Sequence, residues 1–536
     1  MASKGEEGNG SARIRSEVLV IGSGIGGCTT ALLLAEKGCK VTLVCAGQNL
    51  DDGNTALAQG GIVYQGRDDQ PDQLRNDIQV AGRSLNYRRA VQYLSKHGPE
   101  AVRNLLVDRL KVPFEREEDN SFKLTREGGH GRNRILYCAD YTGWAIMDRL
   151  KRAVKNCENI NLLTRRTAVD LLTTHHHSQR LEYKYQLLNQ CVGAYLFNQH
   201  TGQVEMALAD YTVLATGGVG QVYLHTTNTP GSIGSGLTMA QRSGAKVLNC
   251  EYVQFHPTAL FQRGGQQFLI TEAIRGEGAK FIRMDGKPFM KEYDPRGDLA
   301  PRDVVTRAIV EEMLKTGDDF VYLDAANYVE NDLPRRFPTI HHRCLELGID
   351  MTRQAIPVVP AAHFFCGGIL VDQQGRSTLH RLYAVGECTC TGVHGANRLA
   401  STSLLEGLLW GQSAAESIGA KMGKKNRLSG KLIGSIPHWT NPGTEDREDP
   451  ALIAQDWATI KNTMWNYVGI VRTTSRLNRA YDDLYNLNKR LYEFYRHTPI
   501  SRPLIQLFHG CQTANLITFF ALRNLKSTGC HYRVDS

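Results

Sequence analysis

The patterned part of the chain opens with four consecutive apolar residues at 18–21, a run typical of a strand that is buried on both faces. This run leads directly into a glycine-rich stretch at 22–27, which is followed by a segment at 28–37 rich in alanine and leucine. A second apolar run lies at 41–44. Strand, glycine loop, helix and strand in this order predict a βαβ unit that binds a dinucleotide.

The glycine loop has the spacing G-x-G-x-x-G. Gly22 permits the tight turn after the strand, Gly24 allows a pyrophosphate to approach the backbone, and Gly27 lets helix and strand pack closely. The helix N-terminus adds free N–H groups and a partial positive charge. We therefore expect the whole loop to contact the cofactor, through Gly22, Ser23, Gly24, Ile25, Gly26 and Gly27.

The end of the second predicted strand departs from the usual dinucleotide pattern. An acidic residue normally stands there and binds the adenosine ribose. This chain has Cys45 and Ala46 instead. Either backbone groups or the nearby Asn54 must then bind the ribose.

Segments far apart in the chain repeat this pattern of an apolar run followed by glycines. Such runs lie at 213–218 and 382–387, and the stretches 54–62 and 392–404 are rich in small residues. A cofactor that lies extended through one domain would contact all of them. From residue 450 onward, apolar residues recur at helical spacing, which predicts a C-terminal helical bundle.

Composition narrows the classes of function. The 536 residues exceed what one hydrophobic core holds, so about two to four domains are expected. The net charge of +9 is spread without a basic run, which argues against nucleic-acid binding and mildly favours a small anionic ligand. The 13 cysteines include no CxxC pair, so no metal site is predicted. No apolar stretch reaches the ~18–20 residues of a membrane span, and we expect a cytoplasmic protein, with a plastid location left open.

In the order of these motifs the chain resembles the flavoprotein family that comprises succinate dehydrogenase, fumarate reductase and L-aspartate oxidase, from about residue 17 to its end. The resemblance implies an α/β fold with a Rossmann-like FAD-binding domain in two segments, 14–249 and 363–422. An inserted α+β capping domain would span 250–362, and a C-terminal helical domain would span 450–536.

The resemblance also implies which residues contact FAD. Besides the glycine loop, these are Asn54, Thr55, Ala58, Gln59, Gly60 and Gly61 for the flavin ring, Ala168 and Val169 for the adenine side, Glu387 for the ribityl or ribose region, and Ser403 and Leu404 for the isoalloxazine edge. The membrane-complex members bind FAD covalently through a histidine at the place of Asn54. Since an amide cannot form that bond, we expect non-covalent FAD. Ser235 is a further departure, because aspartate oxidases have an aspartate there.

Scattered polar residues supply the expected substrate site. By resemblance, His256, His363 and Arg398 would bind two substrate carboxylates, and Arg302 would transfer a proton to or from carbon. Arginine fits a carboxylate with two parallel hydrogen bonds, but it is a very weak acid, so Arg302 needs a close anionic partner. The neighbours assigned to substrate binding are Gln254, Thr258 and Thr271.

Glu127, in the segment 125–130, distinguishes between members of the family. By resemblance, aspartate oxidases have this glutamate where succinate and fumarate enzymes have an apolar residue. The ammonium group of aspartate needs a counter-charge, whereas succinate has no such group, and a carboxylate buried without a cation is costly. We therefore expect oxidation of L-aspartate to iminosuccinate by hydride transfer to FAD, with dioxygen or fumarate as the oxidant.

The resemblance further implies a biological setting. Iminosuccinate would feed quinolinate synthase in the de novo synthesis of NAD, which would link the two enzymes functionally. Two alternatives stay open on the sequence. One is a soluble fumarate reductase or succinate dehydrogenase-type flavoprotein, which has no use for Glu127. The other is an electron-transfer subunit that docks to an iron–sulfur partner.

Overall fold

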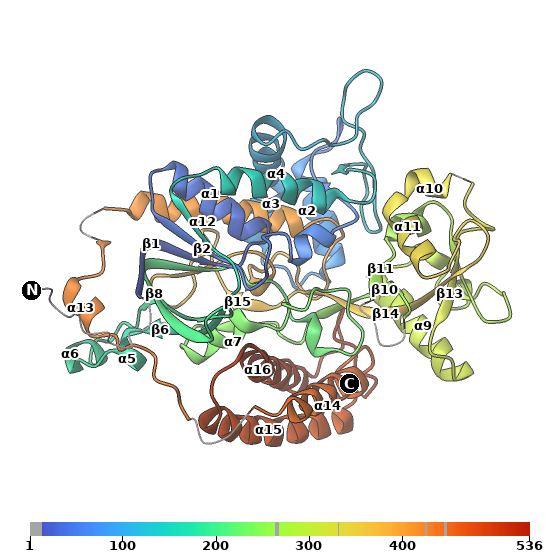
Figure 1. Ribbon diagram of the computed structural model, residues 1–536. Coiled ribbons are helices and arrows are strands. Elements are labelled where there is room, and N and C mark those ends of the chain that lie inside the picture. The colour runs from blue at the N-terminus through green and yellow to red at the C-terminus, as the bar shows by residue number, and fades with distance from the viewer. Residues whose placement is uncertain (1–12, 263–266, 331, 424–425, 444–447, 536) are drawn as a thin grey trace, which may run out of the picture.

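The computed structural model describes residues 13–262, 267–330, 332–423, 426–443 and 448–535. Its largest sheet has seven strands (Figure 1). In this sheet β5, β2, β1 and β8 are neighbours in that order and run parallel to one another. β1 pairs in parallel with β2 through a crossover that contains helix α1 (Ile25–Glu36), as the βαβ pattern predicts. The order is β5 (Ile160–Leu163), β2 (Val41–Val44), β1 (Arg13–Ile21), β8 (Gln203–Leu214), β7 (Cys191–Asn198) and β6 (Arg166–Thr173), and β16 (Leu382–Ala384) pairs with β8.

Helices cover both faces of this sheet (Figure 1). One face carries α1 together with α3 (Arg88–Ala101), α4 (Thr142–Lys155) and α12 (Ser403–Lys421). Helices α1 and α12 approach closely because glycines form their contact: a Cβ atom on Gly26 would lie 3.1 Å from the Gly407 carbonyl oxygen. This contact brings the late segment of the chain against the first dinucleotide-binding helix.

A second sheet is antiparallel and has its own hydrophobic core, which includes Phe281, Phe289 and Phe337. The two long strands β10 and β14 connect the cores: Phe255 and Ala362 pack in the main core, whereas the far ends of both strands pack in the second one. The predicted domain boundaries at 250 and 362 stay a prediction. The elements are β11 (Phe268–Leu269), β10 (Val253–Leu260), β14 (Ile356–Phe365), β13 (Val321–Asp324), β12 (Lys280–Ile282), α9 (Arg302–Thr316), α10 (Leu333–Arg336) and α11 (Pro338–Glu346).

The C-terminal helices α14 (Pro450–Tyr467), α15 (Thr474–His497) and α16 (Arg502–Arg523) lie on the other side of the main sheet (Figure 1). Each begins where the side chain of the preceding residue accepts hydrogen bonds from the first turn: Asp449, Thr473 and Ser501. These caps fix the starts of a helical bundle, as the apolar spacing predicts.

Short elements complete the fold. They are α2 (Pro71–Ala81), α5 (Thr174–His177), α6 (Leu181–Lys184), α7 (Ser235–Arg242), α8 (Glu272–Gly276), α13 (Gly430–Gly434), β3 (Ile62–Val63), β4 (Ile135–Leu136), β9 (Val247–Leu248), β15 (Gly368–Leu370) and β17 (Thr389–Cys390). Within the described ranges, no helix combines the length and the apolar character that crossing a membrane requires.

Candidate active site

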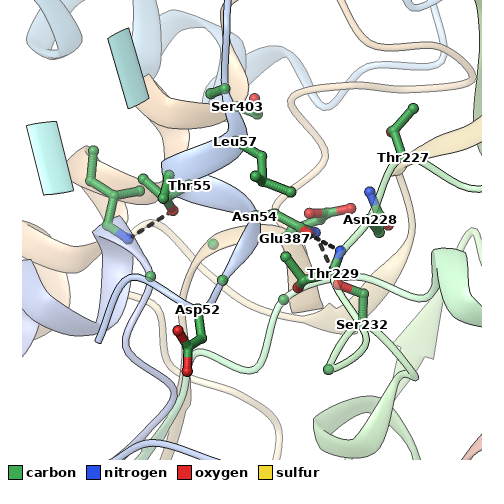
Figure 2. Close-up of a pocket in the computed structure, with 18 of the residues that line it drawn as sticks. Asp52, Asn54, Thr55, Leu57, Thr227, Asn228, Thr229, Ser232, Glu387 and Ser403 are labelled. Atoms are coloured by element: carbon green, nitrogen blue, oxygen red, sulfur yellow. Dashed lines mark hydrogen bonds between the residues drawn. The ribbon is translucent and has the colours of Figure 1, made fainter. Parts of the chain in front are cut away.

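One large cavity, of about 1140 Å³, extends from the glycine loop after β1 to a polar cluster beside β10 and β14. Figure 2 shows the part of it around Asn54 and Glu387. Ligand sites usually measure about 300–1,000 Å³, so this one has room for a dinucleotide and a small second ligand. Of the predicted cofactor residues, all line the cavity except Val169. The side chain of Val169 packs in a separate apolar cluster, while its neighbour Ala168 faces the cavity.

The glycine loop leaves the N-terminus of α1 open toward the cavity. Gly22 has φ +115°, and a Cβ atom there would lie 2.0 Å from the Ala215 carbonyl oxygen. Gly24, the N-cap of α1, has no such neighbour except the Thr55 hydroxyl at 3.2 Å. The Ile25 N–H donates to that same hydroxyl over 3.1 Å, and the first turn of the helix has no acidic residue. This end of α1 is built to receive an anion.

Asn54 lies on the wall of the cavity, close to Glu387 (Figure 2). Its Nδ2 donates to the Ser232 hydroxyl over 3.0 Å, and its Oδ1 accepts from the Thr229 N–H over 2.8 Å. These bonds commit the Asn54 amide to the 229–232 loop, near Glu387.

Glycines also bring the backbone close to two of the acidic residues that line the cavity. A Cβ atom on Gly60 would lie 2.3 Å from Glu127 Oε1, and one on Gly218 would lie 2.1 Å from Glu387 Oε1. Glu387 accepts from the Phe365 N–H over 3.1 Å. Burial nevertheless raises the pKa of Glu387 to about 7. A group that donates a hydrogen bond to this carboxyl would favour its ionised form.

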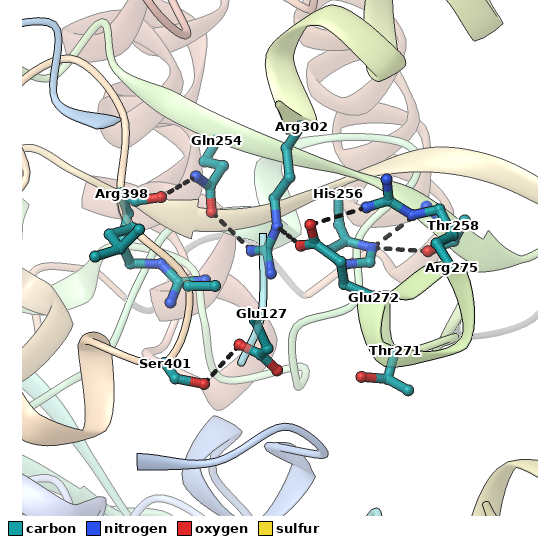
Figure 3. Close-up of polar contacts among 12 residues, drawn as sticks. Glu127, Gln254, His256, Thr258, Thr271, Glu272, Arg275, Arg302, Arg398 and Ser401 are labelled. Carbon is teal, nitrogen blue, oxygen red and sulfur yellow. Dashed lines mark hydrogen bonds and ion pairs between the residues drawn. The ribbon is translucent and has the colours of Figure 1, made fainter. Parts of the chain in front are cut away.

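The polar cluster centres on Arg302, the first residue of α9 (Figure 3). Its Nε donates to Glu272 Oε2 over 2.6 Å, and its Nη1 donates to Gln254 Oε1 over 3.2 Å. Glu272 is also 3.3 Å from Nη2 of Arg275. Burial alone would raise the pKa of Glu272, but the two arginines outweigh it and hold this pKa at about 2. Arg302 thus has the anionic partner that its expected role requires.

Glu272 and Arg275 are the functional candidates that the sequence reasoning missed. The signal was present, since a glutamate and an arginine three residues apart share one face of a short helix. Thr271 caps that helix and lines the cavity. Gln254 and Thr258 do not line it; instead they hold residues that do.

His256 presents a hydrogen-bond donor to the cavity. Burial, together with the charges of Arg302 and neighbouring groups, holds its pKa well below the usual value, so the ring is neutral. The Thr258 N–H donates to Nδ1 of His256, so Nδ1 acts as an acceptor. The Thr258 hydroxyl donates its own proton to the Ile270 carbonyl. The remaining proton is therefore on Nε2, which is buried and has no partner among the described residues.

His363 and Arg398 complete the cationic side of the cluster. The His363 ring lies 5.0 Å from that of His256 and contacts the Thr227 hydroxyl through Nδ1, 2.9 Å away. Burial lowers the pKa of Arg398 to about 10, which leaves the guanidinium charged at neutral pH. Its Nη1 donates to Ser403, whereas its buried Nε has no partner in the described part of the chain.

Glu127 faces this cationic group from the opposite side (Figure 3). Its Oε2 accepts from the Ser401 hydroxyl over 2.6 Å. Burial raises the pKa of Glu127, and the positive charge of Arg302 opposes that shift. The cavity therefore offers cations and neutral donors for a dianion, and one carboxylate placed apart from them for a positive group.

Comparison with known proteins identifies the family. The model of the FAD binding domain family matches residues 17–404. L-aspartate oxidase of Pseudomonas aeruginosa is 42% identical over an alignment of 535 positions, which covers 98% of this chain and 96% of that protein. The chain belongs to the L-aspartate oxidase family. L-aspartate oxidase 2-a, chloroplastic, of Nicotiana tabacum is 36% identical over an alignment of 544 positions, which covers 96% of this chain and 81% of that protein.

The predicted fold class is confirmed by solved structures related to this family. The quinol fumarate reductase of E. coli superimposes with a TM-score of 0.87 at 26% identity, over 98% of this chain and 92% of that one. Sdh1 of Mycobacterium smegmatis superimposes with a TM-score of 0.80, also at 26% identity, over 98% of this chain and 89% of that one.

Membership of the L-aspartate oxidase family makes FAD the cofactor, and the cavity fits it. The open helix N-terminus suits the pyrophosphate, and Gly24 leaves the space that this group needs. The paired glycines at 60–61 let this part of the cavity wall pack closely against Glu127 and Leu136. When bound, FAD supplies the hydride acceptor that no side chain provides.

Proposed function

We propose that this protein oxidises L-aspartate to iminosuccinate. The observation that carries the proposal is the placement of Glu127 opposite a cluster of arginines and neutral histidines in the FAD cavity. Aspartate has two carboxylates and one ammonium group, and the cavity offers complementary groups for all three. Relatives at 36–42% identity are L-aspartate oxidases, which favours this function over the fumarate reductase alternative.

In this proposal the substrate carboxylates bind to Arg398, to the Nε2–H group of His256 and to the imidazole of His363. A neutral histidine costs less to bury than a charged one and still donates a hydrogen bond. Gln254 positions two arginines at once, because it accepts from Arg302 and donates to the Arg398 carbonyl over 2.9 Å. Such clamping directs the Cα–H of the substrate toward the flavin site and supplies much of the rate advantage.

Arg302 is held for proton transfer by its ion pair with Glu272. The ion pairs of Glu272 with Arg302 and with Arg275 link the substrate site to the interior of the predicted capping domain, residues 250–362, with a charged group at each step. Glu127 holds the substrate ammonium group and thereby selects aspartate over succinate. We propose dioxygen or fumarate as the acceptor that reoxidises the cofactor, quinolinate synthase as the consumer of the product, and the cytoplasm as the location.

A set of substrates tests the proposed function. L-aspartate is expected to drive dioxygen consumption by the FAD-loaded protein. L-asparagine and succinate, which lack one carboxylate and the ammonium group respectively, are expected to give kcat/KM values at least about 100-fold lower. A protein that uses L-asparagine as well as L-aspartate would refute the two-carboxylate site.

FAD is expected to be bound non-covalently, because Asn54 offers no nucleophile for the flavin. Denaturation with trichloroacetic acid, followed by centrifugation, should leave the yellow colour in the supernatant. Flavin fluorescence that stays with the washed precipitate, or with the protein band on a denaturing gel, would contradict this expectation.

The affinity for FAD is expected to rise with pH up to about 7. In the empty site burial holds the pKa of Glu387 near 7, and hydroxyl groups of FAD that donate to this carboxyl would lower it. Binding then releases a proton, so the association constant rises by up to about tenfold per pH unit below pH 7 and levels off above it. The apoprotein itself should lose stability on this account between pH 4.5 and about 7, because the folded state binds the proton more tightly.

Calorimetric titration with FAD in buffers of different ionisation enthalpy measures the released proton. Glu387→Gln is the matched variant, since it keeps the shape of the side chain and cannot ionise. A wild-type affinity that is flat between pH 5.5 and 7.5 would show that Glu387 does not face the cofactor.

A further inference from the structure

Helix α16 presents a line of polar side chains to the main domain. Arg502, Gln506, His509 and Thr513 are spaced by four, three and four residues, so they share one face of the helix. The Thr513 hydroxyl donates to the Ile233 carbonyl over 2.8 Å. A Cβ atom on Gly234 would lie 2.4 Å from the Thr513 hydroxyl oxygen. Because these residues interlock, α16 is held against the start of α7.

Three residues of this face line the FAD cavity together with Ala168 and Ser235: Arg502, Gln506 and His509. Arg502 donates from Nη1 to Gln199 Oε1 over 3.0 Å, and Gln199 donates from Nε2 to the Ala46 carbonyl over 2.8 Å. Ala46 directly follows Cys45 at the end of β2, where dinucleotide-binding folds hold the adenosine ribose. This face of α16 therefore lies at the adenosine end of the cavity.

His509 has an unused polar atom in this wall. The residue is 1% exposed, and its Nε2 lies 3.1 Å from the Val169 carbonyl and 3.2 Å from Nη2 of Arg242. Burial keeps the ring neutral by holding its pKa well below the usual value. Nδ1 has no partner among the described residues, so it is free to pair with a ligand, as donor or acceptor according to the tautomer. Gln506, one turn earlier, adds an amide that can both donate and accept.

We propose that Gln506 and His509 of α16 bind the adenosine half of FAD, so that the C-terminal helical region forms one wall of the cofactor site. Adenine carries both ring acceptors and an exocyclic amino donor, which match an amide and a free imidazole nitrogen. The proposal rests on the binding of FAD, which the proposed function also requires, but it does not depend on the substrate.

Titration of the apoprotein with FAD, followed by flavin fluorescence, tests this wall. Gln506→Ala is expected to weaken FAD binding roughly 3- to 10-fold, as for the loss of one hydrogen bond, and His509→Phe by a similar factor. ADP, the probe for the adenosine half, should compete less well in both variants. Riboflavin, which lacks this half, should bind with unchanged affinity. Gln455→Ala, on the exposed side of α14, is the matched control and should bind FAD as the wild type does.

The proposal is overturned if Gln506→Ala and His509→Phe, each with a wild-type circular dichroism spectrum, bind FAD and ADP as tightly as the wild type. It is equally overturned if riboflavin loses as much affinity as FAD, since the effect would then be a general loosening of the fold. A wild-type protein that binds FAD but leaves L-aspartate unoxidised would refute the proposed function and leave this wall untouched.

Discussion

Replacing Arg302 with glutamine is expected to lower kcat/KM for L-aspartate by about 10²–10³-fold, with most of the loss in kcat. The guanidinium donates simultaneously to Glu272 and Gln254, and no neutral amide can reproduce this charged fork. Arg302→Lys keeps the charge but not the geometry, so it should be intermediate. Steady-state kinetics with L-aspartate, alongside the flavin absorption spectrum, measures both quantities.

The control for this change is Arg353→Gln in the same cap region. The Arg353 side chain is 85% exposed and lies outside the cavity, so activity should not change. Arg302→Gln that retains more than a tenth of the wild-type kcat, with a normal flavin content, would remove Arg302 from the chemistry.

Glu127→Gln is expected to lower kcat/KM for L-aspartate by about 100-fold or more, as when one partner of a buried charge pair is lost. Most of the effect should appear in KM, because the carboxylate holds the ammonium group before reaction. The response to succinate should not fall, since succinate makes no use of the Glu127 charge. Parallel titrations with both substrates and a dye acceptor give the ratio of variant to wild-type kcat/KM for L-aspartate and for succinate.

Two companion variants make the Glu127 test specific. Glu117→Gln changes an exposed residue of the same loop region and should be silent. Ser401→Ala removes the hydroxyl that donates to Glu127 and should raise KM for L-aspartate more mildly, because the carboxylate itself stays. Equal losses for L-aspartate and succinate in Glu127→Gln would show that Glu127 supports the fold of the site, not the choice of substrate.

The dinucleotide unit was predictable because its signals are local. The turn at Gly22, the open helix N-terminus and the two flanking strands all lie within 18–44, so the order of residues alone specifies them. The C-terminal helices were predictable for the same reason. The cap was harder, because its strands β10 and β14 are about 100 residues apart in sequence and share residues with both cores.

The site residues also divide into those with a local signal in the sequence and those that only folding brings together. Val169 was assigned to the adenine side together with Ala168, but consecutive residues of a strand point to opposite faces, and only Ala168 lines the cavity. Glu272 becomes significant only when folding places it beside Arg302. The contribution of α16 was beyond prediction, since Gln506 lies more than 400 residues from the glycine loop that it would assist.

The most direct test of the central claim is anaerobic reduction of the FAD-loaded protein, with L-aspartate and succinate added separately while flavin absorbance is followed. The site described above predicts rapid bleaching by L-aspartate and little or none by succinate, with colour restored when fumarate or air is admitted. Bleaching by succinate and not by L-aspartate would contradict the role of Glu127 and return the protein to the succinate and fumarate enzymes.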